Sequence, residues 1–265
     1  VLTPSADGVT VYQNDLASID ASNTSQGYVM VKYNGTNEKV KLQITCPDQS
    51  CYTYLISDRG AYDTFPLTAG NGSYALQVLE NVAGDTYTVS LAQSINVSIE
   101  DEFLPFLYPN QYVNFHTDSK AVSKGSDLAK DTYSDLDVVQ NIYNYVIKNI
   151  SYDTEKAQNV SYGYVPDIDD TLSSKKGICF DYAALMTSML RSQNIPTKLE
   201  VGYSGDAYHA WISTYIDDKG WVDDIIQFNG NTWQIMDPTL AATNDSAAVK
   251  KYVGDGSHYV VKYTY

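Results

Sequence analysis

The fold is decided by one stretch of the chain, Gly177-Ile178-Cys179-Phe180-Asp181-Tyr182-Ala183-Ala184-Leu185-Met186. A cysteine follows a glycine there and opens an almost wholly apolar run, which stops before Asn194-Ile195-Pro196. This pattern predicts a buried helix that begins near Cys179 and ends before the proline. Unpaired backbone N–H groups at a helix N-terminus favour a thiolate over a thiol. Cys179 is therefore our candidate nucleophile, and we expect the rest of the chain to position it.

The chain has 265 residues, of which 43% are hydrophobic, enough for one large core or two ordinary ones. Its formal net charge of −15 argues against nucleic acid or an anionic membrane as a partner. We expect this charge to be spread over a solvated surface rather than to line a binding groove. No apolar run approaches the roughly 18–20 residues that span a bilayer, so no transmembrane segment is predicted.

Tyrosine is abundant, at 24 residues, whereas lysine and arginine together number 17. Richness in Tyr, Thr, Asn and Ser with little lysine is typical of exported, β-rich surface proteins. We therefore expect a secreted or cell-surface protein, with cell-surface or cell-wall components among its partners. The sequence begins Val1-Leu2-Thr3-Pro4 without a signal-peptide pattern, so we expect a mature or trimmed form that has lost its targeting information.

The cysteine count, 3, is odd. Cys46 and Cys51 flank a short turn between two β-like runs, where they either bridge the ends of a hairpin or remain two reduced thiols. Their spacing is a poor metal signal, because no second pair and no nearby histidine completes it, and we expect no metal. If Cys46 and Cys51 are paired, Cys179 has no partner cysteine, which is typical of a reactive thiol.

The first hundred or so residues alternate between apolar and polar side chains. Asn34-Gly35 between two alternating runs predicts a hairpin. Several such runs predict an all-β, immunoglobulin-like sandwich over residues 1–108, which serves as a spacer, substrate-guiding or attachment module. Two prolines in the segment 103–109 mark the boundary with a second domain, residues 109–265. The predicted strands are 28–33, 40–44, 74–78, 87–91 and 95–99.

Helical periodicity begins the second domain. Apolar residues from Val138 to Ile150 follow one face of a helix, which starts near Ser134. The segment 152–170 is expected to be a loop, and 170–176 a short helical turn. Strands are predicted after the cysteine helix, at 197–203, 209–216, 221–228, 232–236 and 259–263, with a hairpin through Asn229-Gly230. Helices followed by antiparallel strands predict an α+β domain with the cysteine helix packed on the sheet.

A thiol nucleophile needs a base, and the base needs an orienting acceptor. Of the 3 histidines, His116, His209 and His258, only His209 opens an apolar strand. Asp237 ends the strand that follows Asn229-Gly230, so neighbouring strands would place the His209 and Asp237 side chains together. Asp223 and Asp224, which follow Trp221, compete for the role of acceptor.

The combined pattern resembles the transglutaminase-like core superfamily, of the bacterial secreted type. The residues that carry the resemblance are Gly177-x-Cys179-x-Asp181-Tyr182-Ala183, Arg191-x-x-x-Ile195-Pro196, Gly202-Tyr203, His209-Ala210-Trp211 and Trp233-x-x-x-Asp237-Pro238-Thr239. The resemblance spans residues 135–239. It implies a papain-like transglutaminase core without a cofactor. Cys179 would be the nucleophile, His209 the general base and acid, and Asp237 the orienting carboxylate.

The resemblance also implies acyl transfer, in which the thiolate attacks an amide carbonyl of a protein or peptide and forms a thioester. The Cys179 N–H and one side-chain donor would bind the oxyanion, with Tyr152 as the candidate donor. Trp211 is expected to pack against the imidazole and keep it dry. An acidic cluster at Asp167, Asp169 and Asp170 could hold calcium, but it lacks the spacing of a calcium loop, and a solvated loop is expected.

We favour a cysteine hydrolase, because the chain is small and lacks the extra β-domains of animal transglutaminases. A cross-linking transglutaminase that acts on protein glutamines is the first alternative. The second is a non-catalytic surface-binding module that retains the fold. A degenerate member would usually lose a residue of the triad, and Cys179, His209 and Asp237 are all present.

Overall fold

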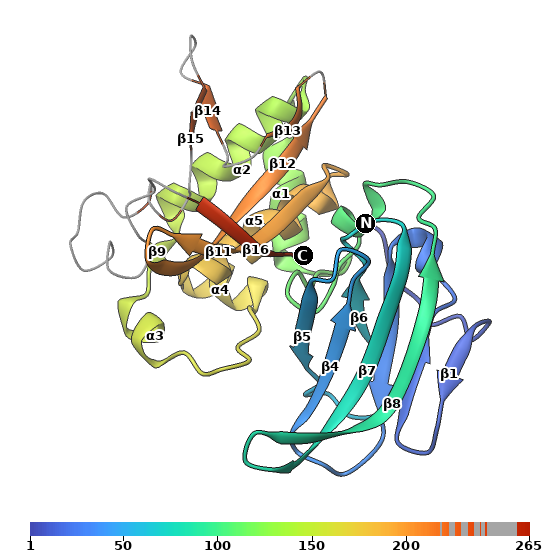
Figure 1. Cartoon of the computed structure of the whole chain (residues 1–265). Coiled ribbons are helices and arrows are strands. Elements are labelled where there is room, and N and C mark those ends of the chain that lie inside the picture. Colours follow the sequence, from blue (N-terminus) through green and yellow to red (C-terminus); the bar gives the residue numbers. More distant parts are fainter. Residues whose placement is uncertain (218, 223–225, 229–232, 236–238, 240–241, 243–258) are drawn as a thin grey trace. The chain divides into compact units, whose positions relative to one another are not determined.

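The computed structural model describes residues 1–217, 219–222, 226–228, 233–235, 239, 242 and 259–265. The chain divides into two compact units. One is Pro4–Pro105, and the other is Val1–Thr3 with Phe106–Tyr265. Figure 1 colours the first unit blue to green and the second mostly green to red. No helix among the described residues is long and apolar enough to cross a membrane.

The unit Pro4–Pro105 consists of two four-stranded antiparallel sheets. Residues of β4 are alternately buried and half-buried, as the alternating sequence predicts. Fully buried aromatic side chains, among them Tyr33, Tyr54 and Phe65, form the core. In sheet order, the strands are β1 (Val11–Gln13), β2 (Ala17–Asp20), β3 (Tyr28–Tyr33) and β6 (Asp63–Pro66), and then β5 (Cys51–Leu55), β4 (Val40–Thr45), β7 (Gly72–Ala83) and β8 (Thr86–Val97).

The hairpin predicted through Asn34-Gly35 is wrong, because β3 and β4 lie in different sheets. Tyr33 is fully buried, and its hydroxyl donates to the carboxylate of Glu80 and accepts from the backbone N–H of Asn37. Burial of this ring outweighs the local turn preference, and the chain crosses to the other sheet. Two separate strands predicted at 87–91 and 95–99 are also wrong, since both belong to β8, which pairs with β7 along its length.

Cys46 and Cys51 are both free thiols, at the end of the hairpin formed by β4 and β5. Cys46 is buried, whereas Cys51 is exposed. Burial raises the pKa of the Cys46 thiol to about 11. The sequence allows a disulfide bridge or two reduced thiols, and the structure has the two reduced thiols.

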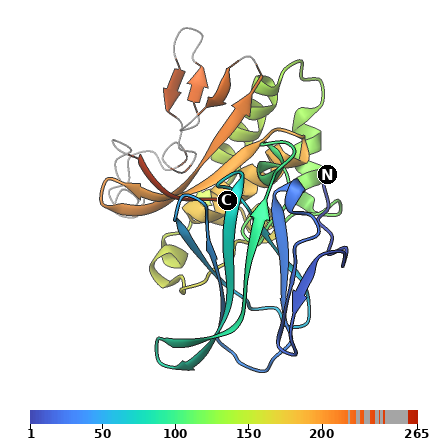
Figure 2. The same cartoon turned by 45° about the vertical axis from the view of Figure 1, so that its right-hand side comes forward.

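Three longer helices lie on one side of the sheet in the second unit, where α5 contacts the strands and α1 and α2 pack against α5 (Figure 1 and Figure 2). The helix predicted after Ser134 is present as α2, and the Ser134 side chain accepts from the backbone N–H of Asp137. The sequence pattern does not predict α1, which buries only Ala121, Val122 and Gly125. The three helices are α1 (Lys120–Ala129), α2 (Asp135–Asn149) and α5 (Cys179–Ser192), and the shorter ones are α3 (Thr154–Asn159) and α4 (Ile168–Ser174).

The central sheet of this unit is antiparallel, and α5 packs against its two middle strands. Helices on an antiparallel sheet confirm the mixed α and β organisation that the sequence predicts. The segment 221–228 is not one strand as predicted, because it contributes to two sheets, and the predicted loop 152–170 contains α3. In sheet order, the strands are β13 (Gly220–Val222), β12 (Ala207–Ile216), β11 (Thr197–Ser204) and β16 (Tyr259–Thr264). The pairs β9 (Ser151–Tyr152) with β10 (Lys176–Gly177) and β14 (Ile226–Phe228) with β15 (Trp233–Ile235) lie apart from it.

The end of α5 is held by Arg191, which is buried and donates to three backbone carbonyls. Its Nε donates to Thr197 at 2.9 Å, Nη1 to Tyr108 at 2.7 Å, and Nη2 to Tyr265 at 2.8 Å. One guanidinium thus joins the helix to three separate segments of the second unit.

Candidate active site

Cys179 is the first residue of α5, as the sequence predicts, and its side chain is half-buried. The carboxylate of Asp181 caps this helix, since its Oδ2 accepts from the backbone N–H of Ile178 at 2.8 Å. Gly177 lies directly against this carboxylate, and a Cβ added there would be 2.7 Å from the Cβ of Asp181. Position 177 therefore requires glycine, because the capping side chain of Asp181 approaches its backbone closely. The cap fixes the start of α5, so Cys179 lies at the positive end of the helix dipole.

Asp181 is fully buried and is shared by two further donors. The ammonium of Lys156 lies 2.8 Å from Oδ2, and the hydroxyl of Tyr164 donates to Oδ1 at 2.5 Å. Burial, together with the neighbouring Asp181 carboxylate, raises the pKa of the Tyr164 phenol well above its usual range, so the ring remains a neutral donor. These contacts tie α3 and the segment after it to the start of the cysteine helix.

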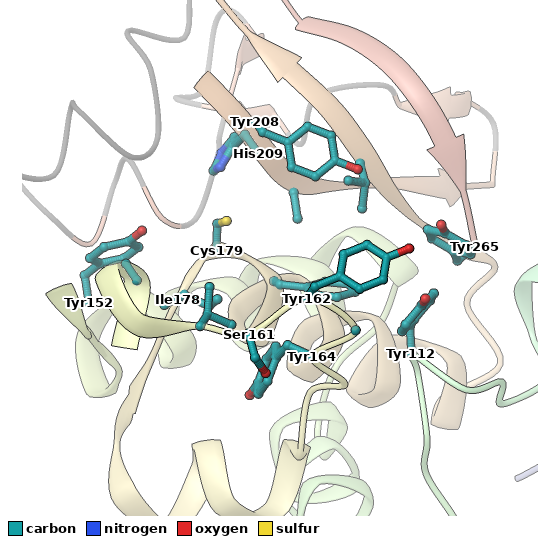
Figure 3. A pocket seen from close by; sticks show the side chains of 16 residues that line it. Tyr112, Tyr152, Ser161, Tyr162, Tyr164, Ile178, Cys179, Tyr208, His209 and Tyr265 are labelled. Atoms are coloured by element: carbon teal, nitrogen blue, oxygen red, sulfur yellow. The ribbon is translucent and has the colours of Figure 1, made fainter. Parts of the chain in front are cut away.

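A two-residue parallel ladder places Tyr152 beside the nucleophile. Ser151 pairs with Lys176 and Tyr152 with Gly177. The backbone N–H of Asp153 donates to the carbonyl of Gly177 at 2.9 Å and extends the ladder. In Figure 3 the hydroxyl of Tyr152 is directed toward the side of the cavity where Cys179 lies.

His209 lies in β12, opposite Gly202 of β11, and is 1% exposed. Its ring centroid is 6.0 Å from that of Trp211 and 6.3 Å from that of Tyr259, so aromatic rings restrain the imidazole. A Cβ on Gly202 would lie 2.0 Å from the carbonyl oxygen of Val260, and only glycine lets β16 approach this closely. Figure 3 shows the Cys179 sulfur pointing toward the His209 imidazole.

The predicted acceptor Asp237 lies outside the described residues, as do its competitors Asp223 and Asp224. His258 also lies outside them. His116 lines a different cavity, together with Asp167 and Asp169. Among the candidate groups that the structure describes, it brings together Cys179, His209, Tyr152 and Trp211.

The acidic cluster caps helices. Asp167 accepts from the backbone N–H of Asp170 at 2.8 Å, at the start of α4. Asp169 accepts from the first backbone N–H groups of α1, at 3.0 Å from Lys120 and 2.9 Å from Ala121. Negative charge at these helix starts is favourable. No group of three or more His, Cys, Asp or Glu side chains in the described part of the chain could hold a metal ion.

A cavity of about 360 Å³ opens between Cys179 and His209. Its walls come from α3 and the following segment, the start of α5, and strands β11 and β12. The sequence pattern does not mark these walls, because a tyrosine at a cavity has the same sequence context as one in a core. Of the lining residues, Ile178, Phe180, Tyr208 and Ala210 adjoin predicted site residues, and Tyr152 is itself one. The cavity is lined by six tyrosines, Tyr112, Tyr152, Tyr162, Tyr164, Tyr208 and Tyr265.

This arrangement has the parts that nucleophilic catalysis by a thiol requires. A cysteine at a helix N-terminus faces an imidazole that can accept and return its proton. The backbone N–H groups at the start of α5 and the phenol of Tyr152 are groups of the kind that can donate to an oxyanion. The cavity beside them can hold the substrate.

Comparison with known proteins finds one matching family and several similar proteins. Residues 123–223 match the model of the transglutaminase-like superfamily. A UPF0252 protein of Methanocaldococcus jannaschii is 30% identical over 118 residues, which are 38% of this chain and 34% of that protein. The kyphoscoliosis peptidase of Mus musculus is 30% identical over 107 residues, 36% of this chain and 16% of that protein. The matched segments thus span about a third of the Methanocaldococcus jannaschii protein and about a sixth of the mouse peptidase.

A candidate cysteine protease from Cytophaga hutchinsonii is among the similar solved structures. It is 15% identical, with a TM-score of 0.41, and the match covers 88% of this chain and 70% of that one. The family match includes β9, all of α5 and strand β12, which carry Tyr152, Cys179 and His209. The segment of this chain from residue 123 to residue 223 belongs to the transglutaminase-like superfamily.

Proposed function

We propose that the chain is a thiol-dependent acyl-transfer enzyme that hydrolyses amide bonds of a protein or peptide. The observation that carries this proposal is the pair of side chains Cys179 and His209, which face one another across a single cavity. Asp237 completes the proposed triad as the carboxylate that orients the imidazole. The name of the mouse relative, a peptidase, supports hydrolysis over a binding role.

In the proposed reaction, His209 takes the proton of Cys179, and the thiolate attacks the carbonyl carbon. The backbone N–H of Cys179 and the Tyr152 hydroxyl stabilise the oxyanion of the tetrahedral intermediate. His209 then donates its proton to the leaving amine as the C–N bond breaks, which leaves a thioester on Cys179. Water, deprotonated by His209, attacks the thioester and releases a carboxylic acid and the free thiol.

Trp211 and Tyr259 serve this chemistry by restricting the imidazole rather than by contacting the substrate. Trp211 is 2% exposed and its ring centroid lies 4.9 Å from that of Tyr259. A ring confined in this way keeps its orientation and loses little freedom when the substrate binds. Exclusion of water around it strengthens its electrostatic interactions.

The unit Pro4–Pro105 is proposed to be an immunoglobulin-like β-sandwich that attaches the enzyme or guides its substrate. Its two four-stranded sheets and aromatic core are compatible with that architecture. The abundance of tyrosine over lysine supports a secreted or cell-surface location. Protein or peptide substrates there would include cell-surface or cell-wall components.

Mass spectrometry of casein incubated with a primary amine tests the proposal, with the wild type compared with Cys179→Ala. Cleavage or deamidation that depends on Cys179 is the expected result. Incorporation of the amine at glutamine would instead identify a cross-linking enzyme. Casein left unchanged by the wild type, in the presence of a Cys179 that alkylating reagents can reach, would contradict the hydrolase and favour a binding module. Cys51→Ala, which removes an exposed thiol of the other unit, is the matched control.

A further inference from the structure

Among the described residues that line the cavity beside Cys179 there is no acidic side chain and no lysine or arginine. Besides the tyrosines, its lining is largely apolar and includes Ile178, Phe180 and Val201. A charged side chain that entered it would lose its hydration without gaining a partner of opposite charge, which is costly. An uncharged side chain would bury apolar surface there and gain free energy.

One wall of the cavity is a continuous series of ring contacts. Tyr164 lies 6.5 Å from Phe180, Phe180 lies 5.3 Å from Tyr112, and Tyr112 lies 4.8 Å from Tyr265, between centroids. These residues come from separate segments of the second unit, and Tyr164 is held in addition by Asp181. A wall built in this way is formed before the substrate binds, so little ordering is required on binding.

Two tyrosines at the edge of the cavity are unusually exposed for aromatic residues. Tyr208 is 54% exposed and Tyr162 is 78% exposed. Tyr208 adjoins His209 in β12 and is braced by Tyr203, with ring centroids 5.5 Å apart. Exposed aromatic rings beside a reactive thiol offer apolar contact to the part of a substrate that lies next to the reacting bond.

The size of the cavity limits what it can take. About 360 Å³ lies at the lower end of the range for small-molecule sites, roughly 300–1,000 Å³. This volume suits one large side chain with its adjoining peptide groups rather than a folded domain. The net charge of −15 also disfavours acidic substrates at long range.

We propose that the cavity binds an uncharged aromatic or large aliphatic side chain of a peptide, next to the amide bond that Cys179 attacks. Tyr208 and Tyr162 determine this preference from the two sides of the cavity mouth. This inference rests on the proposed function, since it assigns the substrate class of the same site.

A matched set of peptidyl acyloxymethyl ketones, identical except for Phe, Leu, Lys or Glu beside the ketone, tests it. The thiolate of Cys179 displaces the carboxylate leaving group and forms a thioether, which peptide mapping locates. We expect the Phe and Leu reagents to modify Cys179 about tenfold faster or more than the Lys and Glu reagents. Tyr208→Ala should reduce this ratio toward one, and so should Tyr162→Ala. Tyr133→Ala should leave it unchanged, because Tyr133 is 97% exposed and lies outside the cavity lining.

Equal rates for the four reagents, or faster modification by Lys or Glu, would overturn the inference. So would modification of Cys179 by iodoacetamide but by none of the ketones. The ratio measured on the wild type alone decides the substrate class if a tyrosine variant fails to fold. Preference for Phe and Leu without cleavage of any amide would retain the cavity assignment and reject the hydrolase, so the two proposals fail separately.

Discussion

The hydroxyl of Tyr164 donates a 2.5 Å hydrogen bond to Oδ1 of Asp181, a carboxylate buried in the first turn of the helix that begins with Cys179. The same carboxylate caps the helix through Ile178 and pairs with Lys156. The aromatic wall of the cavity and the candidate nucleophile therefore share one anchor. A change at this anchor should affect substrate preference and stability together.

Asp181→Asn tests the anchor, because it preserves shape and removes the charge that Lys156 pairs with. We expect the free energy of unfolding to fall by about 1–3 kcal/mol, measured by urea denaturation. The preference for Phe over Lys reagents should also weaken as the Tyr164 wall loosens. Asp127→Asn is the control, since Asp127 pairs with Lys130 at the exposed surface and should change neither quantity. Equal stability of wild type and Asp181→Asn would refute the role of the anchor.

Iodoacetamide at pH 6 should distinguish Cys179 from the other thiols of the same molecule. An ordinary thiol, with a pKa of about 8.5, reacts slowly at this pH. We expect Cys179 to be modified about tenfold faster or more than the exposed Cys51, as counted by mass spectrometry. His209→Ala should reduce the Cys179 rate to that of Cys51. Similar rates for the two cysteines in the wild type would remove the catalytic interpretation of Cys179.

Tyr152→Phe removes the proposed oxyanion donor and keeps the ring that lines the cavity. Loss of one such donor lowers kcat by about 10²-fold in enzymes where it has been measured, with little change in KM. We expect that pattern here, in an amide or ester assay at saturating substrate. A rise in KM with constant kcat would show that the hydroxyl binds the substrate instead. Tyr133→Phe serves as the control for loss of a phenol.

Arg191→Lys should destabilise the second unit. A lysine ammonium cannot reproduce the planar fork that serves the carbonyls of Thr197, Tyr108 and Tyr265. Buried carbonyls left without a donor should lower the free energy of unfolding by about 2–4 kcal/mol, again by urea denaturation. Arg59→Lys replaces an exposed arginine and should stay within about 0.5 kcal/mol of the wild type. Comparable losses in both variants would argue against a special role for Arg191.

The buried Cys46 thiol should make stability depend on pH in the alkaline range. Burial raises its pKa from 9.0 to about 11, so the unfolded chain loses this proton first as pH rises. Stability from this group is complete below about pH 9 and is lost as pH approaches 11, by up to about 2 kcal/mol. Unfolding at pH 8.5 and 10.5 should therefore differ less in Cys46→Ala than in the wild type. Cys51→Ala should keep the wild-type difference.

The elements that carry the chemistry could be predicted because their signals are local. An apolar run ended by Pro196 marks α5, Ser134 marks the start of α2, and the apolar run that His209 opens marks β12. Each signal lies within a few residues of the structure that it determines. The family pattern then joined Cys179 with His209, which are distant in the sequence.

The rest depends on contacts between distant segments, which no local pattern encodes. Tyr33 shows this in the first unit, where burial of one ring overrides the turn preference of Asn34-Gly35. Tyr164 shows it at the site, because its bond to Asp181 joins residues on opposite sides of α4 in the sequence. The one local clue was Asp181 itself, at the third helical position, where a carboxylate commonly caps. The predicted role of Asp237 stays a prediction.

The ladder that pairs Tyr152 with Gly177 has a consequence for how this chain can be altered. Residues 153–176 begin and end at this ladder, so the segment is an insert whose two ends are held together by the strand pair β9 and β10. Within it, α4 packs on α5 and Asp169 caps α1, so the part whose sequence and length can change is residues 157–163, between Lys156 and Tyr164. A graft that keeps Lys156 and Tyr164, which fasten the insert to Asp181, would supply a new cavity wall to the same thiol. Under the proposed function, substrate choice is thereby separable from catalysis, and the insert is the place to redesign it.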